Sequence, residues 1–163
     1  MAFLRIGRIA TRGAFAAGAL GAGLLATMPN LAECHCQVPC GIFDDPMRVS
    51  MLKEDAATIR KAIGQIRELS GSGHIAAQEL NQATRWIMTK EEHASHIIEL
   101  VSTYMLAQRV KEGLFKTKAE YLQALEVHHA VMQAAMKAKQ TTDIAACDAL
   151  DHALKDLAPM YTK

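Results

Sequence analysis

Residues 35–46 read HCQVPCGIFDDP and stand between two different kinds of sequence. The residues before them are rich in glycine and alanine, and those after them follow long helical patterns. His35, Cys36 and Cys40 place three soft metal-binding side chains within six residues, and the only later cysteine is Cys147. This stretch is therefore the first candidate for chemistry.

The first 34 residues have the three parts of a cleavable export signal. Three arginines and no acidic residue occupy the first thirteen positions, and an apolar run extends from Ala14 to about Met28. Ala32 places a small residue three positions ahead of His35, as in signal-peptide cleavage sites. A transmembrane helix usually needs about 20 apolar residues, so this shorter run predicts no stable membrane anchor.

We therefore expect a leader-processing protease to remove residues 1–34, and residues 35–163 to form one exported domain. The periplasm or the extracellular space is the expected compartment. An organelle lumen is the alternative, because three arginines and few acids also suit a transit peptide. The cut would leave His35 as the first residue of the mature chain.

A free N-terminus at His35 would change the metal chemistry of the pair that follows. The α-amine, with a pKa of about 8, can bind a metal once its proton is displaced. The amine, the backbone nitrogen of Cys36 and its sulfur would close two chelate rings, and the sulfur of Cys40 could complete a plane. Two nitrogens and two thiolates in a plane suit Ni(II), with the His35 imidazole as an axial ligand.

Other uses of the two cysteines remain open at this point. A Cys36–Cys40 disulfide is the commonest use of such a pair in an exported protein. A tetrahedral zinc site would need a fourth side-chain ligand from elsewhere in the chain. The spacing alone does not choose between a metal site and a disulfide.

The motif His-Cys-x-x-Pro-Cys-Gly, followed by an aliphatic residue, an aromatic residue and Asp, resembles the N-terminal nickel hook of the nickel superoxide dismutase family. The helical remainder, including residues 90–94 and Tyr104, is also similar to that family. The resemblance covers residues 35–163 and leaves the leader outside.

This resemblance implies a nickel cofactor and superoxide as the small-anion substrate. The ligands and catalytic groups would be His35 through its amine and imidazole, Cys36 through its amide and thiolate, and Cys40 through its thiolate. Ni(III)/Ni(II) cycling at the hook, residues 35–43, would convert superoxide to O₂ and hydrogen peroxide. A homohexamer would clamp the hook between subunits.

The resemblance also raises the question of the groups around the metal. The family usually has Tyr where this chain has Phe43, so a hydroxyl that helps order water and anions is missing. Family members orient the histidine imidazole with an acidic side chain, a Glu, and often with an Arg from a neighbouring subunit. Glu54 is the expected acid, and Arg85 and His93 are alternatives for the base.

Four amphipathic helical patterns follow the hook, each with apolar residues three and four positions apart. The expected apolar stripes are Leu52, Ala56, Ile59, Ile63 and Ile66; then Leu80, Ala83, Ile87, Ala94, Ile97, Val101 and Tyr104; then Leu122, Leu125, His129, Met132 and Met136; and finally Cys147, Leu150, Leu154, Leu157 and Tyr161. These patterns predict an all-α fold, an antiparallel up-down four-helix bundle over residues 46–161 with an N-terminal metal-binding hook.

Local signals predict where the helices begin and end. Asp44, Asp45 and Pro46 are typical of a helix start, and residues 70–73 (SGSG) of a break. We expect Gly113 to end the second helix. Thr117 with Glu120 forms a capping box for the third, and residues 141–143 cap the fourth.

Several polar residues within these patterns have structural interpretations. Lys90 interrupts the apolar seam of the second helix. His93 and His96 are expected to be surface or interface groups, and His129 to be buried with a satisfied hydrogen bond. Cys147 is expected to be a small buried hydrophobic residue.

Net charge argues against one further class of function, nucleic-acid binding. The chain carries a formal charge of +1 with mixed acidic and basic residues, which does not support nucleic-acid binding. The alternative to the enzyme is an exported non-catalytic helical bundle that binds or delivers metal, or carries a Cys36–Cys40 disulfide.

Overall fold

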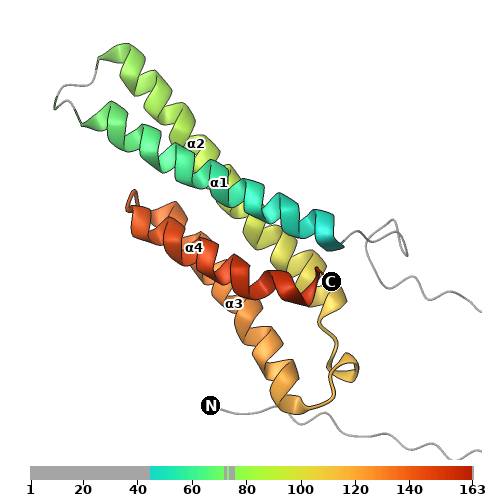
Figure 1. The fold of residues 1–163 in the computed structure, drawn as a ribbon. Helices are drawn as coiled ribbons and strands as arrows, with labels where there is room; N and C mark the ends of the chain where they lie inside the picture. Colours follow the sequence, from blue (N-terminus) through green and yellow to red (C-terminus); the bar gives the residue numbers. More distant parts are fainter. Residues whose placement is uncertain (1–44, 72, 74–75, 163) are drawn as a thin grey trace, which may run out of the picture. The chain divides into compact units, whose positions relative to one another are not determined.

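The computed structural model describes residues 45–71, 73 and 76–162, and all regular structure in this part of the chain is helical. Its elements are α1 (Asp45–Ser70), α2 (Ala77–Glu99), the π-helix η1 (Leu100–Arg109), the 3₁₀ turn η2 (Glu112–Leu114), α3 (Lys118–Gln140), α4 (Ile144–Leu157) and the 3₁₀ turn η3 (Ala158–Met160). Successive α-helices run in opposite directions, and each contacts its two neighbours in the ring α1–α2–α3–α4 (Figure 1). The expected all-α, antiparallel four-helix bundle is confirmed.

The first helix follows its expected pattern. All five residues of its apolar stripe are buried, together with Val49 and Ala62. The helix ends at Ser70, and Gly73 takes a φ of +70°, which favours glycine because it has no Cβ. The expected break after α1 is confirmed.

The second helix differs from expectation in how it ends. The α-helical pattern stops at Glu99 and the chain continues as a π-helix to Arg109, while Gly113 lies in the separate turn η2. The hydroxyls of Ser102 and Thr103 donate to the carbonyl of Glu99 at 3.2 and 2.7 Å. Thr58 and Ser95 make the same kind of bond to the carbonyl four residues earlier while α1 and α2 stay α-helical, so these bonds alone do not explain the wider turn.

Two residues of the α2 seam do not join the core. Leu80 and Ile87 are 58% and 44% exposed, whereas the other five stripe residues are buried. The reason is an offset between neighbouring helices: the C-terminal end of α3 lies at Lys90, so Leu80 and Ile87, which precede Lys90 on α2, extend past it.

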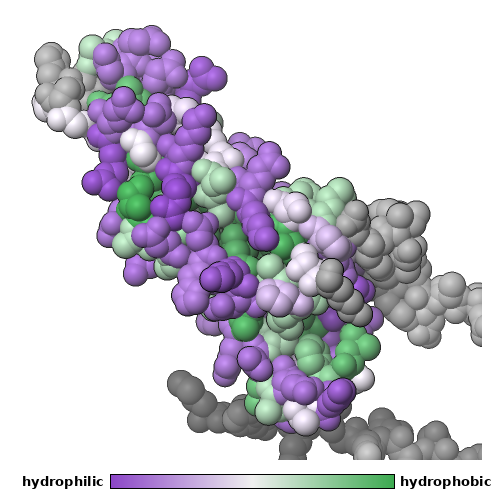
Figure 2. Space-filling view, viewed as in Figure 1, coloured by the Kyte–Doolittle hydropathy of each residue, from purple (hydrophilic) through white to green (hydrophobic). Residues whose placement is uncertain are grey.

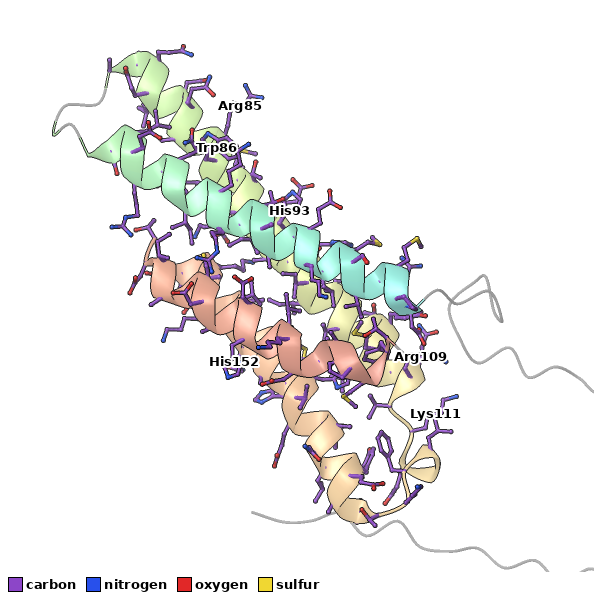
Figure 3. The ribbon with its side chains drawn as sticks, viewed as in Figure 1. Arg85, Trp86, His93, Arg109, Lys111 and His152 are labelled. Atoms are coloured by element: carbon purple, nitrogen blue, oxygen red, sulfur yellow. The ribbon has the colours of Figure 1, made fainter. Side chains whose placement is uncertain are left out.

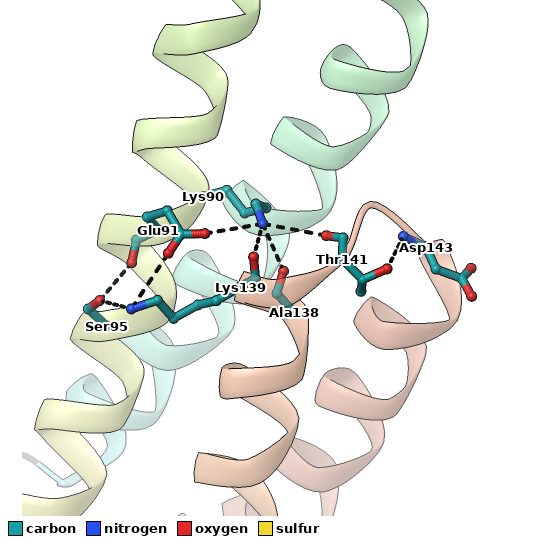
Figure 4. Close-up of polar contacts among 7 residues, drawn as sticks. All are labelled: Lys90, Glu91, Ser95, Ala138, Lys139, Thr141 and Asp143. Atoms are coloured by element: carbon teal, nitrogen blue, oxygen red, sulfur yellow. Dashed lines mark hydrogen bonds and ion pairs between the residues drawn. The ribbon is translucent and has the colours of Figure 1, made fainter. Parts of the chain in front are cut away.

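Lys90 does not interrupt the seam but joins two helices (Figure 4). Its side chain is 6% exposed, and its ammonium donates to the carbonyls of Ala138 at 3.2 Å, Thr141 at 3.4 Å and Lys139. These carbonyls lie at the C-terminal end of α3, where four carbonyls lack intrahelical partners and the helix dipole favours a cation. The aliphatic part of the side chain fills the seam position.

Both expected helix caps are present. Thr117 and Glu120 form a reciprocal capping box at the start of α3, and the Asp143 carboxylate accepts from the Ala145 amide at 3.1 Å at the start of α4. These caps depend only on residues within three positions of each other, which is why the sequence specifies them.

The buried face of α3 is shifted from the expected one. Leu122 and Met136 are 47% and 41% exposed, and His129 is also exposed. The face that packs inward instead consists of Ala124, His128, Val131, Ala135 and Ala138. Three alanines on this face let α3 approach its neighbours closely, because interaxial distance depends on the side chains at the contact.

The fourth helix matches its pattern from Cys147 to Leu157. Cys147 is buried as a free thiol, and burial raises its pKa. Among the described residues no helix is long and apolar enough to cross a membrane. The face in Figure 2 is largely hydrophilic, with a hydrophobic patch near η2, where Leu114 is 71% exposed.

Candidate metal centre and its surroundings

The predicted ligands His35, Cys36 and Cys40, and the neighbouring Phe43, lie outside the described residues. Their assignment therefore stays a prediction from sequence, as does the leader boundary at residue 34. The described residues begin at Asp45, two positions after the expected hook. The structure therefore shows which side chains surround the start of α1, the end of the bundle to which the hook is joined.

Asp45 is held by two side chains of the π-helix. The Tyr104 hydroxyl donates to Oδ1 at 2.7 Å, and Nη2 of Arg109 donates to Oδ2 at 2.5 Å. The Asp45 side chain is 16% exposed, and Figure 3 shows Arg109 beside the first turn of α1. Burial and the bond to Asp45 raise the pKa of Tyr104 to about 12, and Asp45 raises the pKa of Arg109.

A second cluster lies along α1 and α2, ten residues further into α1. Both carboxylate oxygens of Asp55 are occupied, Oδ1 by Nδ1 of His93 at 2.6 Å and Oδ2 by Nδ1 of His96 at 2.7 Å. Because an ionised carboxylate only accepts, both Nδ1 atoms donate. The Asp55 side chain is 8% exposed, and the imidazoles are 33% and 41% exposed.

The interpretation of His93 and His96 as surface or interface groups missed this shared carboxylate. Its sequence signal is the position of Asp55, three residues after Leu52 and beside Ala56 on the buried stripe. An acid on such a stripe needs a buried partner. The two partners are then separated by one helical turn of α2.

An open pocket of about 290 Å³ faces this cluster, lined by Met51, Glu54, Glu92 and the three clustered residues. Glu54, the expected acid, lies in its wall, but Asp55 is the carboxylate that bonds His93. Arg85 points outward from α2 (Figure 3) and is eight residues from His93, about 12 Å along the helix. Of the two residues expected as the basic group, His93 is thus the one that is bonded to a carboxylate, that of Asp55.

Residues 45–71, 73 and 76–162 contain no group of three His, Cys, Asp or Glu side chains arranged to hold a metal ion. The donors of the expected hook fit nickel by their chemistry, because they combine amine, amide and imidazole nitrogens with two thiolates.

The chain combines an all-helical bundle with a preceding stretch of sequence that holds one histidine and two cysteines within six residues. This combination defines the class: a helical protein with soft metal donors at one end of its sequence. A sequence model of the nickel-containing superoxide dismutase family matches residues 30–163. The chain belongs to this family, which makes it an oxidoreductase with nickel as cofactor and superoxide as substrate. No curated protein and no solved structure matches the chain.

Family membership confirms the expected enzyme class and cofactor. It also decides against the alternative of a non-catalytic bundle, which the spacing of the cysteines had left open.

Proposed function

We propose that this enzyme removes superoxide at a hook formed by residues 35–43 after the leader is cut off. The supporting observation is the motif from His35 to Gly41, which lies inside the family match and directly ahead of α1. The donors are the amine and imidazole of His35, the amide and thiolate of Cys36, and the thiolate of Cys40.

Nickel, when bound, would supply the Ni(III)/Ni(II) couple that takes an electron from one superoxide and gives it to a second. The balance is 2 O₂⁻ + 2 H⁺ → O₂ + H₂O₂. The thiolates and the deprotonated amide make that couple accessible, and the chain must exclude competing ligands and deliver two protons.

Asp55 and His93 are proposed as the acid and base that orient the His35 imidazole. The resemblance implies one group of each kind, and these two form a bonded pair that joins α1 to α2. Asp55 thus replaces Glu54 in the proposal. Asp55→Asn should weaken nickel retention, whereas Glu54→Gln, on the exposed neighbour, should retain it. Equal nickel contents in the two variants would contradict this pair.

Assembly as a homohexamer is proposed from the resemblance. It is supported by the exposed apolar side chains of α2, namely Leu80, Ile87 and Met88, of which Met88 is 66% exposed. Subunit packing would remove this surface from water and hold the short hook in place. Light scattering on the processed protein tests the subunit number.

Export and processing are tested by intact mass and location. The mature protein should begin at His35, be found outside the cytoplasm, and retain nickel when purified gently. Cys36→Ser should lose nickel and activity, while Cys147→Ala, at a buried cysteine of the bundle, should keep both. Full activity in Cys36→Ser, or a mature chain starting elsewhere, would contradict the proposal.

A further inference from the structure

The expected hook leads into α1, and the first residue of α1 is bonded to a separate element, η1. We call this residue, Asp45, the base of the hook. Asp45 is the first residue of α1, and both of its carboxylate oxygens accept bonds from η1. The Asp45 side chain is largely buried, so these charge-assisted bonds are less screened by solvent than a surface ion pair.

The π-helix is what allows two residues of one helix to reach this carboxylate. Tyr104 and Arg109 are five positions apart, and residues so spaced would point about 140° apart around an α-helix. The i to i+5 bonding of a π-helix brings such residues much closer to one face. The amide of Val110 donates to the carbonyl of Met105 at 3.0 Å, which maintains this register to the end of the segment.

Further contacts hold Tyr104 itself. Tyr104 is 4% exposed, and the guanidinium of Arg48 lies 5.3 Å from the centre of its ring. The Tyr104 ring is therefore held by contacts other than its bond to Asp45.

We propose that Arg109, with Tyr104, is a positioning residue for the metal hook. By fixing the Asp45 carboxylate, these residues hold the first turn of α1, to which the hook is joined in the sequence. This role rests on the proposed function for its chemical consequence, but the bonds that fasten α1 involve none of the proposed metal ligands and can be tested without nickel.

The chain offers a matched control for this test. Arg60 also ties α1 to another helix, through bonds of 2.7 and 2.6 Å to Asp148 and Asp151 of α4. Its side chain is 35% exposed and that of Arg109 is 36% exposed. Arg60→Gln and Arg109→Gln thus each remove an ion pair between α1 and another element. The partners of Arg60 are more exposed, 67% and 50% against 16% for Asp45, and only Arg109 touches the base of the hook.

The first measurement is hydrogen exchange of residues 46–53 in the processed, metal-free protein. Arg109→Gln should speed exchange there roughly tenfold, as expected for loss of a bond to a charged group, and Arg60→Gln should not. Tyr104→Phe should act in the same direction with the ring retained, which keeps the test available if Arg109→Gln fails to fold. Equal exchange in the Arg109, Tyr104 and Arg60 variants would overturn the proposal.

The second measurement is made with nickel added. Arg109→Gln should release nickel roughly tenfold faster and broaden the Ni(III) electron paramagnetic resonance signal, whereas Arg60→Gln should match the wild type. Arg109→Lys, which retains the charge, should restore part of both. If the wild type holds no nickel, the proposed function fails, while the exchange data still decide the fastening.

Discussion

The hydroxyl of Tyr161 lies 2.5 Å from Nε2 of His128, and Nδ1 of the same imidazole lies 2.6 Å from the carbonyl of Ala124. A carbonyl only accepts, so Nδ1 carries the hydrogen and Nε2 of the neutral ring accepts from Tyr161. The two rings meet edge to face at 5.7 Å, and His128 is fully buried. This pair ties the chain after α4 to α3.

Removing the hydroxyl should be costly because its partner cannot reach water. Tyr161→Phe keeps the ring and leaves Nε2 of His128 without a donor, so we expect the free energy of unfolding to fall by about 1–2 kcal/mol. Urea denaturation at pH 7.5 measures this. Tyr121→Phe, on the partly exposed start of α3, serves as the control and should change the midpoint little.

Stability should fall in mild acid because of the same histidine. Burial lowers the pKa of His128 below its ordinary value of 6.5. The unfolded state therefore binds more protons than the folded state just below pH 6.5. The stability that the neutral His128 contributes is complete above that pH and is lost as the pH falls toward the folded-state pKa of His128.

The check is urea denaturation between pH 7.5 and 5. The wild type should lose more stability over this range than His128→Gln, and as much as His152→Gln, whose side chain is 76% exposed in the wild type. An unchanged pH dependence in His128→Gln would contradict this origin.

Lys90 should stabilise the bundle more than an exposed lysine does. Lys90→Met preserves much of the aliphatic packing but leaves carbonyls at the end of α3 without their donor, so we expect a loss of about 2–3 kcal/mol. Thermal and urea unfolding measure the change. Lys118→Met, which removes an exposed ion pair with Glu112, should have little effect.

A retained N-terminal residue should prevent activity. A Cys34→Ala chain that keeps this residue ahead of His35 has a peptide nitrogen in place of the free His35 amine, and the added residue brings no thiol that could take its place. We expect at least a tenfold loss of nickel affinity and of superoxide removal, a difference of about 1.4 kcal/mol or more. Nickel titration of the processed and extended chains, followed by superoxide assays, makes the comparison. Equal affinities would show that the amine is not a ligand.

The sequence by itself determined that there are four helical segments, the caps of α3 and α4, and the apolar stripe of α1. Each of these depends on residues within one or two turns: Thr117 with Glu120, Asp143 with the amide of Ala145, and apolar side chains three and four apart. The motif beginning at His35 is local in the same way, which is why it pointed to a family before any fold was known.

Only the tertiary structure decided which polar groups meet. The inward face of α3 includes His128 and not His129 because three alanines allow close approach there, a choice that hydrophobicity alone misjudged. Lys90 reaches the end of α3, and Asp55 reaches two histidines of α2, because separate helices are packed at a particular register. Such contacts depend on the relative rotation and height of helices, which are set when the whole core is buried.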